Sequence, residues 1–294
     1  MSPHISQSFS ESTARKRVLG LLDAGTFAEI LGPAQRVTSP HLALLDVPAA
    51  FDDGVVVGSG QLVGQTVLIA AQEGAFMGGG VGEVHGAKLV GLFQRAVDQR
   101  PAAVLLLAES GGVRLHEANA GLIAVSEVMR ALLDVRAAGI PVVVLIGGAN
   151  GCFGGMGLVA RCADHIVMSD VARLAMSGPE VIEASQGAEE FDSRDRALVW
   201  RTTGGKHRYI TGDCDALADD SMAAFRQAAI DSLNSARPLT LDSLEEEHQF
   251  LSERLRLDGH SADALPIWAR LGVPQPDAVA DMEAAELRAW KEAV

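Results

Sequence analysis

The sequence predicts a protein of the α/β class, in which fully buried strands alternate with helices. Two runs, Ala103–Ala108 (AVLLLA) and Val142–Ile146 (VVVLI), are uninterrupted aliphatic segments of strand length. Strands of this kind belong to sheets that are covered on both faces, because a half-exposed strand would alternate apolar and polar residues. Each run is followed by a glycine cluster and then by a helical pattern, so the unit of strand, turn and helix repeats along the chain.

The chain ahead of these runs is expected to contribute a leading helix and an antiparallel hairpin. Residues Ala14–Leu22 form a short amphipathic pattern that stops at Asp23-Ala24-Gly25, where glycine suits the position past the last helical turn. The β-rich runs Val55–Val63 and Thr66–Ala71 follow, separated by Gly64-Gln65. Glycine as the first central residue favours a type II′ turn, so we predict two antiparallel strands here.

Glycine and proline mark the ends of the helices that follow the strands. One helix is predicted over Val81–Gln99, which a proline closes, and a second over His116–Ala138, which a glycine and a proline end. After the third glycine cluster, His165–Met168 and Arg173–Met176 are predicted to be further short strands.

Beyond about Asp213 the pattern is helical, with no further strand expected. The predicted helical segments are Asp219–Ser235, Ser243–Leu257 and Asp277–Lys291. We therefore divide the chain into an N-terminal helical lead-in (residues 1–50), an α/β domain (51–235) and a helical tail (236–294). The tail is expected to be a cover or a surface for a partner.

Composition excludes several classes of function. With 38 acidic and 24 basic residues the net charge is −14, which opposes binding to nucleic acid or to an anionic membrane surface. The first twenty residues contain no signal-peptide core, and no apolar run approaches the roughly 20 residues that span a bilayer. Three cysteines without paired spacing indicate neither a disulfide framework nor a zinc site, and no metal is expected. We expect a cytoplasmic protein.

Glycine clusters follow three strand ends, at residues 78–80, 111–112 and 147–157. Loops of this kind can turn backbone N–H groups and a helix start toward an anion or an oxygen that becomes negative during a reaction. Taken singly, each cluster is better explained as a tight turn, but three at equivalent positions favour an oxyanion site. A P-loop is excluded because the third cluster lacks a lysine, the Rossmann spacing is not met, and no serine lies in a G-x-S-x-G motif.

Ordered motifs carry a resemblance to a known family. The segments GGGVGEVHGAK (78–88), SGGVRLHE (110–117) and GCFGGMG (151–157) resemble the signatures of the acyl-CoA carboxyltransferases. Within that family, GPEVIE (178–183), EEFDSRDR (189–196) and TGG (203–205) resemble the β subunits of malonate decarboxylases. The resemblance covers about residues 10–235. It implies a crotonase-like fold, a spiral of ββα units with the helical tail attached.

The same resemblance implies an activity and partners. In the family, malonyl is carried as a thioester on a CoA-derived prosthetic group, phosphoribosyl-dephospho-CoA, of an acyl-carrier δ subunit that an α subunit loads. The β subunit and a related γ subunit form a heterodimer with a shared site, which releases CO2 through an oxyanion-stabilised enolate and leaves the acetyl thioester. No cofactor is expected to be attached covalently to this chain.

By resemblance we assign the site residues. The catalytic candidates are Gly111, Gly112, Val113, Gly154, Gly155 and Met156. The substrate-binding candidates are Gly79, Gly80, Lys88, Arg114, Cys152, Phe153 and Glu180.

Several of these assignments have an ordinary structural alternative. Arg114 could instead form an ion pair with Glu117 or Glu109, and Lys88 could be solvated at the surface rather than bind a CoA-type phosphate. His85 is expected to be a hydrogen-bonded residue without a catalytic role. Cys152 is better explained as a packed thiol than as a nucleophile, and Glu180 as a helix-start acid as readily as a proton-handling carboxylate.

Two functional alternatives stay open. The chain could be the matching subunit of a biotin-dependent carboxyltransferase, in which a partner carries the biotin. It could also be a non-catalytic scaffold that binds the carrier, although the intact glycine clusters argue against this.

Overall fold

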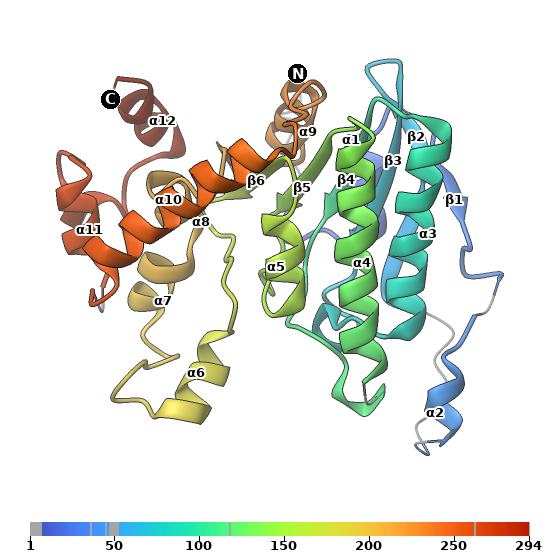
Figure 1. Cartoon of the computed structure of the whole chain (residues 1–294), viewed down its shortest axis with the longest axis horizontal. Helices are drawn as coiled ribbons and strands as arrows, with labels where there is room; N and C mark the ends of the chain where they lie inside the picture. The colour runs from blue at the N-terminus through green and yellow to red at the C-terminus, as the bar shows by residue number, and fades with distance from the viewer. Residues whose placement is uncertain are drawn as a thin grey trace, which may run out of the picture.

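One seven-stranded sheet organises the protein. The computed structural model describes residues 8–35, 37–44, 46, 53–117, 119–261 and 263–293. Strand order in the sheet follows the order along the chain; β1, β2 and β3 pair antiparallel, and every pair from β3 onward is parallel. The strands are β1 (Ala28–Ile30), β2 (Val55–Leu62), β3 (Gln65–Gln72), β4 (Ala103–Leu107), β5 (Val142–Ile146), β6 (His165–Ser169) and β7 (Ala216–Ala218) (Figure 1). The predicted α/β class is confirmed.

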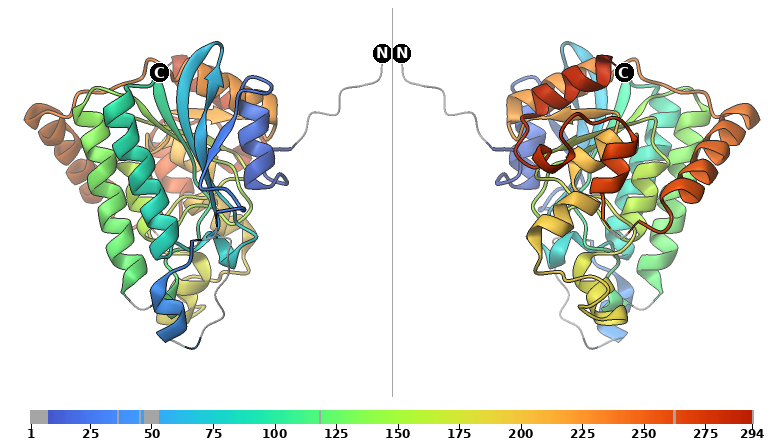
Figure 2. Two further views of the ribbon diagram at one scale, coloured as in Figure 1. Left: turned by 90° about the vertical axis from the view of Figure 1, so that its right-hand side faces the viewer. Right: turned by 90° about the vertical axis from the view of Figure 1, so that its left-hand side faces the viewer.

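Helices cover both faces of the sheet, which explains why its central strands are aliphatic throughout (Figures 1 and 2). One face carries α3 and α4, and the other carries α1 and α9. Their bounds are α1 (Ala14–Leu21), α3 (Glu83–Gln99), α4 (Ala120–Ala137) and α9 (Met222–Asp231). Alternate residues of β4 divide between the two layers: Leu106 packs in the core on the α3 and α4 side, whereas Leu105 and Leu107 pack in the core with α1 and α9.

Local signals fix several helix starts. The side chains of Thr13, Asp195, Ser221 and Thr240 each accept a hydrogen bond from a first-turn N–H, which replaces an acceptor that the helix itself cannot supply. The remaining helices are α2 (Pro40–Leu44), α5 (Gly155–Arg161), α6 (Pro179–Gln186), α7 (Arg196–Thr203), α8 (Gly205–Ile210), α10 (Leu241–Asp258), α11 (Leu265–Arg270) and α12 (Ala284–Ala293), with short 3-10 turns at Met77–Gly79, Leu115–Glu117 and Pro276–Ala278.

A second, much shorter ladder runs beside the main sheet. Its isolated parallel bridges join Val81 to Val113, Ser110 to Cys152 and Cys152 to Leu174. Each repeat of the chain therefore gives one strand to the main sheet, one or two residues to this ladder and then a helix. This is the spiral of ββα units that the resemblance implies.

The hairpin turn differs from its prediction. The register pairs Leu62 with Gln65, so the central residues of the turn are Val63 and Gly64 and not Gly64 and Gln65. Both have positive φ, 46° and 76°. Positive φ at both central residues is the type I′ conformation, which matches the twist of the flanking strands. The chain accepts a valine in a left-handed conformation in order to close the hairpin tightly.

Two strand predictions and the helix starts also need correction. Arg173–Met176 is not a strand, because only its first two residues form isolated bridges. Conversely, β7 lies beyond Asp213 and pairs parallel with β6, although three residues are too few to show a pattern. The helices predicted from Val81 and His116 begin at Glu83 and Ala120.

The C-terminal helices differ in how they contact the core. The buried cluster on the α3 and α4 side includes Trp268 of α11, Leu287 of α12 and also Val279, which lies between these two helices. By contrast, α10 has no buried residue among its 18. Part of the predicted tail is therefore core. The three-part division at residues 50 and 235 stays a prediction.

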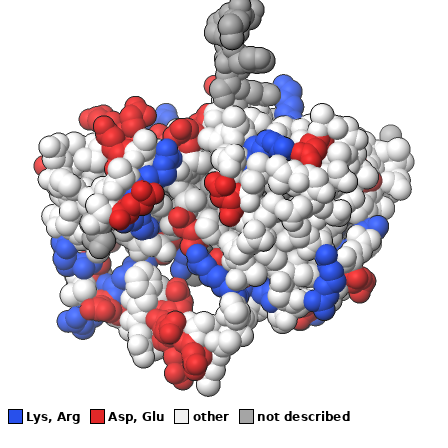
Figure 3. Space-filling model, turned by 90° about the horizontal axis from the view of Figure 1, so that it is seen from above, with Lys and Arg blue, Asp and Glu red and all other residues white. Residues whose placement is uncertain are grey.

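The surface carries charges of both signs. Figure 3, the view from above, shows acidic and basic side chains in small groups separated by uncharged surface. Among the described residues, no helix is both long and apolar enough to cross a membrane.

Candidate active site

The three glycine clusters meet at one edge of the sheet, where β3, β4 and β5 end (lower edge in Figure 1). Gly111 N–H donates to the carbonyl oxygen of Gly78 at 2.8 Å, which joins the second loop to the first. Phe153 N–H donates to the carbonyl oxygen of Ser110, also at 2.8 Å, which joins the third loop to the second. The loops that the sequence singled out therefore form one continuous backbone surface.

Close approach explains why glycine is required in these loops. At Gly79, which has φ of 69°, a Cβ would stand 2.0 Å from the carbonyl oxygen of Glu109. At Gly154, which has φ of 61°, a Cβ would stand 3.1 Å from the Cα of Gly112. Any other residue at Gly79 would push the first two loops apart, and one at Gly154 would strain the backbone where the second and third loops touch.

Three of the six predicted catalytic residues have their N–H groups engaged by the fold. Gly111 donates to Gly78 as described, Gly112 N–H donates to the Ser110 hydroxyl at 3.2 Å, and Gly154 N–H donates to the carbonyl oxygen of Met176 at 2.9 Å. These amides shape the loops and are not available as donors to a ligand without rearrangement.

The other three predicted catalytic residues keep unused donors. Within the described part of the chain, the N–H groups of Val113, Gly155 and Met156 form no hydrogen bond. Gly155 and Met156 are the first two residues of α5, where backbone donors have no acceptor inside the helix. The bridge between Val113 and Val81 is formed by the neighbours of Val113, because Val81 N–H donates to the Gly112 carbonyl and Arg114 N–H donates to the Val81 carbonyl. The N–H of Val113 itself therefore points away from the first loop and toward the third. Backbone donors from two loops thus remain free at one edge.

Lys88 lies inside the protein and its ammonium group is occupied. The Nζ donates to the carbonyl oxygen of Val55 at 2.7 Å and to that of Leu31 at 3.3 Å, and it pairs with the Asp53 carboxylate at 3.1 Å. Only 8% of the residue is exposed. Neither the predicted phosphate contact nor the solvated alternative matches this environment, so Lys88 holds the N-terminal segment against α3.

Arg114 is likewise an internal residue. Its Nε donates to the carbonyl oxygen of Gly80 at 2.8 Å, its Nη1 lies 3.1 Å from Glu117 Oε1, and its Nη2 donates to the carbonyl oxygen of Asp53. The structural alternative, an ion pair with Glu117, is the arrangement seen. Each nitrogen of the guanidinium is thus bonded inside the protein, and Nε fixes the Gly80 carbonyl.

His85 belongs to a buried hydrogen-bonded chain, as expected for a residue without a catalytic role. Its Nε2 lies 3.0 Å from the amide nitrogen of Gln72 and its Nδ1 lies 3.2 Å from the carbonyl oxygen of Asp53. Because the amide donates and the carbonyl accepts, the ring is the neutral tautomer with the proton on Nδ1. Burial, and then the charge of Arg114, lowers the pKa of His85 to about 3.

The side chains of Cys152 and Phe153 are buried, and that of Glu180 is exposed. Burial raises the pKa of the Cys152 thiol to about 12, which makes it a packed thiol and not a nucleophile. Phe153 is buried and its ring faces the Arg173 guanidinium at 5.5 Å. Glu180 is exposed in the first turn of α6. For Cys152 and Phe153 only the backbone can take part in the site.

Glu109 joins the loops and was not predicted as a site residue. Its Oε1 accepts from Asn150 N–H at 3.1 Å, its Oε2 forms an ion pair with Arg17, and its own N–H donates to Gln72 Oε1 at 3.0 Å. Room for this carboxylate is supplied by Gly74, at which a Cβ would stand 2.2 Å away. In the sequence, the signal for a role of Glu109 is an acid that directly follows an apolar strand run and lies between two glycine clusters.

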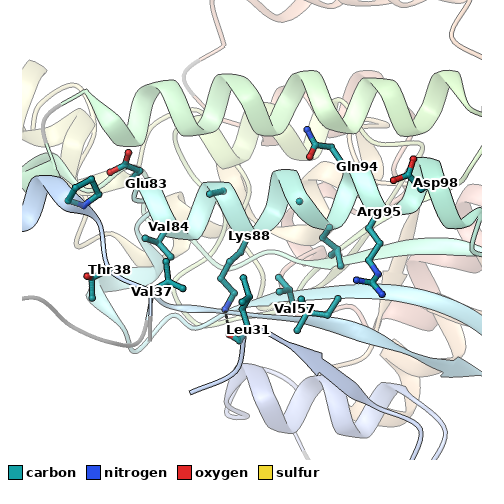
Figure 4. Close-up of a pocket in the computed structure, with 15 residues that line it drawn as sticks. Leu31, Val37, Thr38, Val57, Glu83, Val84, Lys88, Gln94, Arg95 and Asp98 are labelled. Carbon is teal, nitrogen blue, oxygen red and sulfur yellow. Dashed lines mark hydrogen bonds between the residues drawn. The ribbon is translucent and has the colours of Figure 1, made fainter. Parts of the chain in front are cut away.

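A separate cavity of about 620 Å³ lies between α3 and the segment that contains β1 (Figure 4). Leu31, Val37, Val57 and Val84 give it an apolar lining, and Lys88 reaches across it toward the Leu31 carbonyl. No residue of the three glycine clusters lines this cavity. The free amides and the cavity are therefore different features.

Comparison with known proteins identifies the family. A model of the carboxyl transferase domain matches residues 7–245. The chain belongs to the carboxyl transferase domain family. This places it among enzymes that act on carboxyl groups.

Individual relatives agree with this assignment. This chain is 41% identical over 305 residues to the malonyl-S-ACP:biotin-protein carboxyltransferase MADC of Malonomonas rubra. The match covers 96% of this chain and 95% of that protein. A chain of a Pseudomonas malonate decarboxylase hetero-tetramer in complex with malonate superimposes with a TM-score of 0.76 at 42% identity, over 80% of this chain and 86% of that one. A chain of a Pseudomonas malonate decarboxylase hetero-dimer gives 0.67 at 36% identity, over 83% and 95%. The crotonase-like fold is that of these carboxyltransferases.

Proposed function

We propose that this carboxyltransferase is the β subunit of a malonate decarboxylase, which converts a malonyl thioester on an acyl-carrier subunit into the acetyl thioester and CO2. The observation that carries the proposal is the meeting of three glycine loops, which leaves the N–H groups of Val113, Gly155 and Met156 without an acceptor among the described residues. The 42% identity to a malonate decarboxylase chain solved with malonate supports the choice of substrate.

The free amides suit the chemistry of this reaction. When the bond between the carboxylate and the methylene carbon breaks, CO2 leaves and the electron pair moves through the carbon into the thioester carbonyl, whose oxygen becomes negative. Preformed N–H donors stabilise that enolate oxygen more than the neutral carbonyl of the substrate, so they lower the barrier. A proton then adds to the carbon and completes the acetyl group. One such donor is worth roughly 10² to 10³ in rate.

The part of the carrier's prosthetic group that this chain is proposed to bind is its thioester. Free backbone amides are the donors that a thioester oxygen needs, whereas Lys88 and Arg114, the cations considered for phosphate contacts, are both bound internally. We therefore assign the thioester oxygen to the loops and give Lys88 and Arg114 no phosphate contact. The phosphoribosyl-dephospho-CoA group itself would arrive on the δ subunit after loading by the α subunit.

A γ partner is proposed to complete the site. Leu115, Ile123, Met176 and Val181 are exposed apolar residues that follow the glycine loops or lie at the helix starts beside them. Exposed apolar groups gathered around a site indicate a surface that another chain covers. The similar Pseudomonas proteins were solved as a hetero-dimer and a hetero-tetramer, which supports a heteromeric assembly.

A second function is favoured by one specific observation. The Malonomonas rubra protein is named a malonyl-S-ACP:biotin-protein carboxyltransferase, and its identity to this chain is 41% over nearly the whole length of both. In that case the carboxyl group would pass to biotin on a partner and would not be released. The chemistry at the enolate oxygen would be the same, so the amides alone do not separate the two functions.

The test is release of CO2 from malonyl-CoA by the chain, alone and co-purified with the subunit encoded beside it, with and without avidin. Release that needs the partner and resists avidin supports the decarboxylase with a shared site. Release that avidin abolishes would transfer the assignment to the biotin-dependent enzyme. Binding of the carrier subunit by a folded pair that releases no CO2 from malonyl-carrier would leave a scaffold.

A further inference from the structure

Two arginines lie against the same tryptophan beside the third glycine loop. The guanidinium carbons of Arg173 and Arg196 lie 5.2 and 5.1 Å from the centre of a Trp200 ring. Arg173 also lies 5.5 Å from the centre of the Phe153 ring, which belongs to the loop. Contacts between a cation and an aromatic ring at these distances hold a guanidinium in place without using its N–H groups. Arg173 and Arg196 are called the arginine pair below.

Most N–H donors of the arginine pair are unused. Arg173 Nη2 donates to the carbonyl oxygen of Ala149 at 2.7 Å. Among the described residues, the other two nitrogens of that guanidinium and all three of Arg196 form no hydrogen bond or ion pair. Arg196 is exposed, and Arg173 and Trp200 are partly exposed, so a ligand can reach them. The pair therefore offers several donors to the oxygen atoms of an anion.

The acids near the pair do not neutralise it by direct contact. Asp195 precedes Arg196, but its Oδ1 accepts a backbone N–H of the first turn of α7 at 2.9 Å. Burial lowers the pKa of Arg173, the charge of Glu180 raises it, and the charge of Arg196 lowers it. The described acids of the loop before α7 also form no ion pair with either arginine: Glu189, Glu190 and Asp192. The two positive charges thus act on each other, and an anion bound to both would relieve the repulsion.

The pair lies near the free amides but not among them. Cys152 N–H donates to the carbonyl oxygen of Arg173 at 2.8 Å, and Gly155 follows Cys152 by three residues. Three residues span at most about 11 Å of chain. In a thioester of the CoA type, the pantetheine arm separates the thioester from the nearest phosphate. An anion site on the same loop, but removed from the free amides, matches that separation in kind.

The chemistry of the reaction decides which anion the pair can bind. A malonyl thioester on a CoA-type group has two kinds of anion, the carboxylate that leaves as CO2 and the phosphates. The carboxylate loses its charge in the transition state, so arginines bound to it would stabilise the substrate more and slow the reaction. A phosphate keeps its charge throughout, and the planar guanidinium binds phosphate through two parallel hydrogen bonds. A phosphate is therefore the better occupant.

We propose that Arg173 and Arg196 bind a phosphate group of the CoA-type carrier of the thioester, with Trp200 holding both guanidinium groups in position. The proposal rests on the proposed function, because that function supplies a substrate attached to a phosphorylated group. It provides the phosphate contact that Lys88 and Arg114 do not make. In this account the arginine pair sets the affinity for the carrier group, and the glycine loops stabilise the enolate.

Kinetics with a truncated substrate test the contact. Malonyl-pantetheine has the same thioester as malonyl-CoA but no phosphate. In the co-purified complex, Arg196→Gln should raise KM for malonyl-CoA about tenfold and leave kcat for CO2 release unchanged, because it removes a charge-assisted contact to a group that does not react. Both constants for malonyl-pantetheine should stay unchanged. The matched control is Arg194→Gln, which removes the same charge from an exposed arginine two residues away and should change neither substrate.

A conservative variant and three outcomes decide between a phosphate contact and other roles. Arg196→Lys keeps the charge and should hold KM for malonyl-CoA within about threefold of that of the unmodified chain. An equal rise of KM for both substrates in Arg196→Gln would make the arginine a structural residue and overturn the proposal. A rise as large in Arg194→Gln would reduce the effect to general surface charge. Weaker assembly of the complex with both KM values unchanged would assign the pair to the partner subunit, and would also overturn it.

Binding of CoA, which needs no turnover, separates this proposal from the proposed function. Arg196→Gln should weaken equilibrium binding of CoA to the complex about tenfold and leave binding of pantetheine unchanged. If this holds while CO2 release is absent or is abolished by avidin, the phosphate contact stands and the decarboxylase function fails. Unchanged CoA binding in the variant, with avidin-resistant CO2 release intact, would remove the contact and leave the function.

Discussion

Replacing Glu109 by glutamine tests the idea that one buried carboxylate holds the glycine loops together. The carboxylate pairs with Arg17 and accepts the N–H of Asn150, and side-chain exposure is 3% for Arg17 and 6% for Glu109. Glutamine can still accept from Asn150, but it leaves the Arg17 guanidinium buried without a counter-charge. Breaking a buried pair in this way costs about 3–5 kcal/mol, which is a large share of the roughly 5–15 kcal/mol that stabilises a folded domain.

Urea denaturation measures this loss. We expect Glu109→Gln to lower the free energy of unfolding by about 3–5 kcal/mol. Adding Arg17→Met should recover part of the loss, because no uncompensated charge then remains. Glu127→Gln removes an exposed partner of Arg130 and should change stability by no more than about 0.5 kcal/mol. A loss below about 1 kcal/mol in Glu109→Gln, or a double variant less stable than the single one, would refute the reasoning.

Three further predictions concern the rest of the fold. Burial lowers the pKa of both His85 and His207 from 6.5 to about 3, so between about pH 6 and pH 4 only the unfolded chain takes up these protons. The free energy of unfolding should therefore fall by about 1.4 kcal/mol for each histidine with every pH unit of acidification in that range. A urea midpoint that does not change over that range would contradict this. Because Val63 has a positive φ that asparagine adopts more easily, Val63→Asn should stabilise the protein by about 1 kcal/mol in thermal or urea unfolding, whereas the exposed Val171→Asn should not. Iodoacetamide should modify Cys162 before Cys152 or Cys214, whose thiols burial holds at a pKa of about 12, and mass spectrometry showing equal rates would count against their burial.

Much of the sheet could be predicted because its strands are chemically uniform. The runs at β4 and β5 were recognisable since both of their faces pack under helices. The hairpin turn lies one residue from its predicted place because Val63 adopts a conformation that its side chain disfavours, and the pairing of β2 and β3 offsets this cost. The strand β7 was missed because three residues carry no periodicity, and its position depends on the edge of β6.

The candidate site was predictable as a set of loops but not as a set of donors. Spacing identified the three glycine clusters, and they do meet. Which amides are free depends on acceptors such as the Met176 carbonyl and the Ser110 hydroxyl, and no local pattern reveals those bonds. In the same way the sequence around Lys88 suggests a ligand contact, whereas in the structure Lys88 pairs with Asp53, 35 residues away in sequence.

The central claim is that backbone N–H groups at the start of α5 stabilise the enolate oxygen. Gly155→Pro removes one such donor at the first helical position, where proline is well tolerated. A side chain at Gly155 would meet Val125 Cγ1 at 2.6 Å, so both this variant and its control, Gly155→Ala, are made in a Val125→Ala background. The alanine control carries a Cβ but keeps the N–H.

The deciding measurement is kcat for CO2 release by these two variants, each in complex with the partner subunit and each checked for equal stability. The account predicts that the proline variant is slower than the alanine variant by roughly 10² to 10³. Equal kcat values in the two folded complexes would contradict the assignment of Gly155 N–H to the oxyanion.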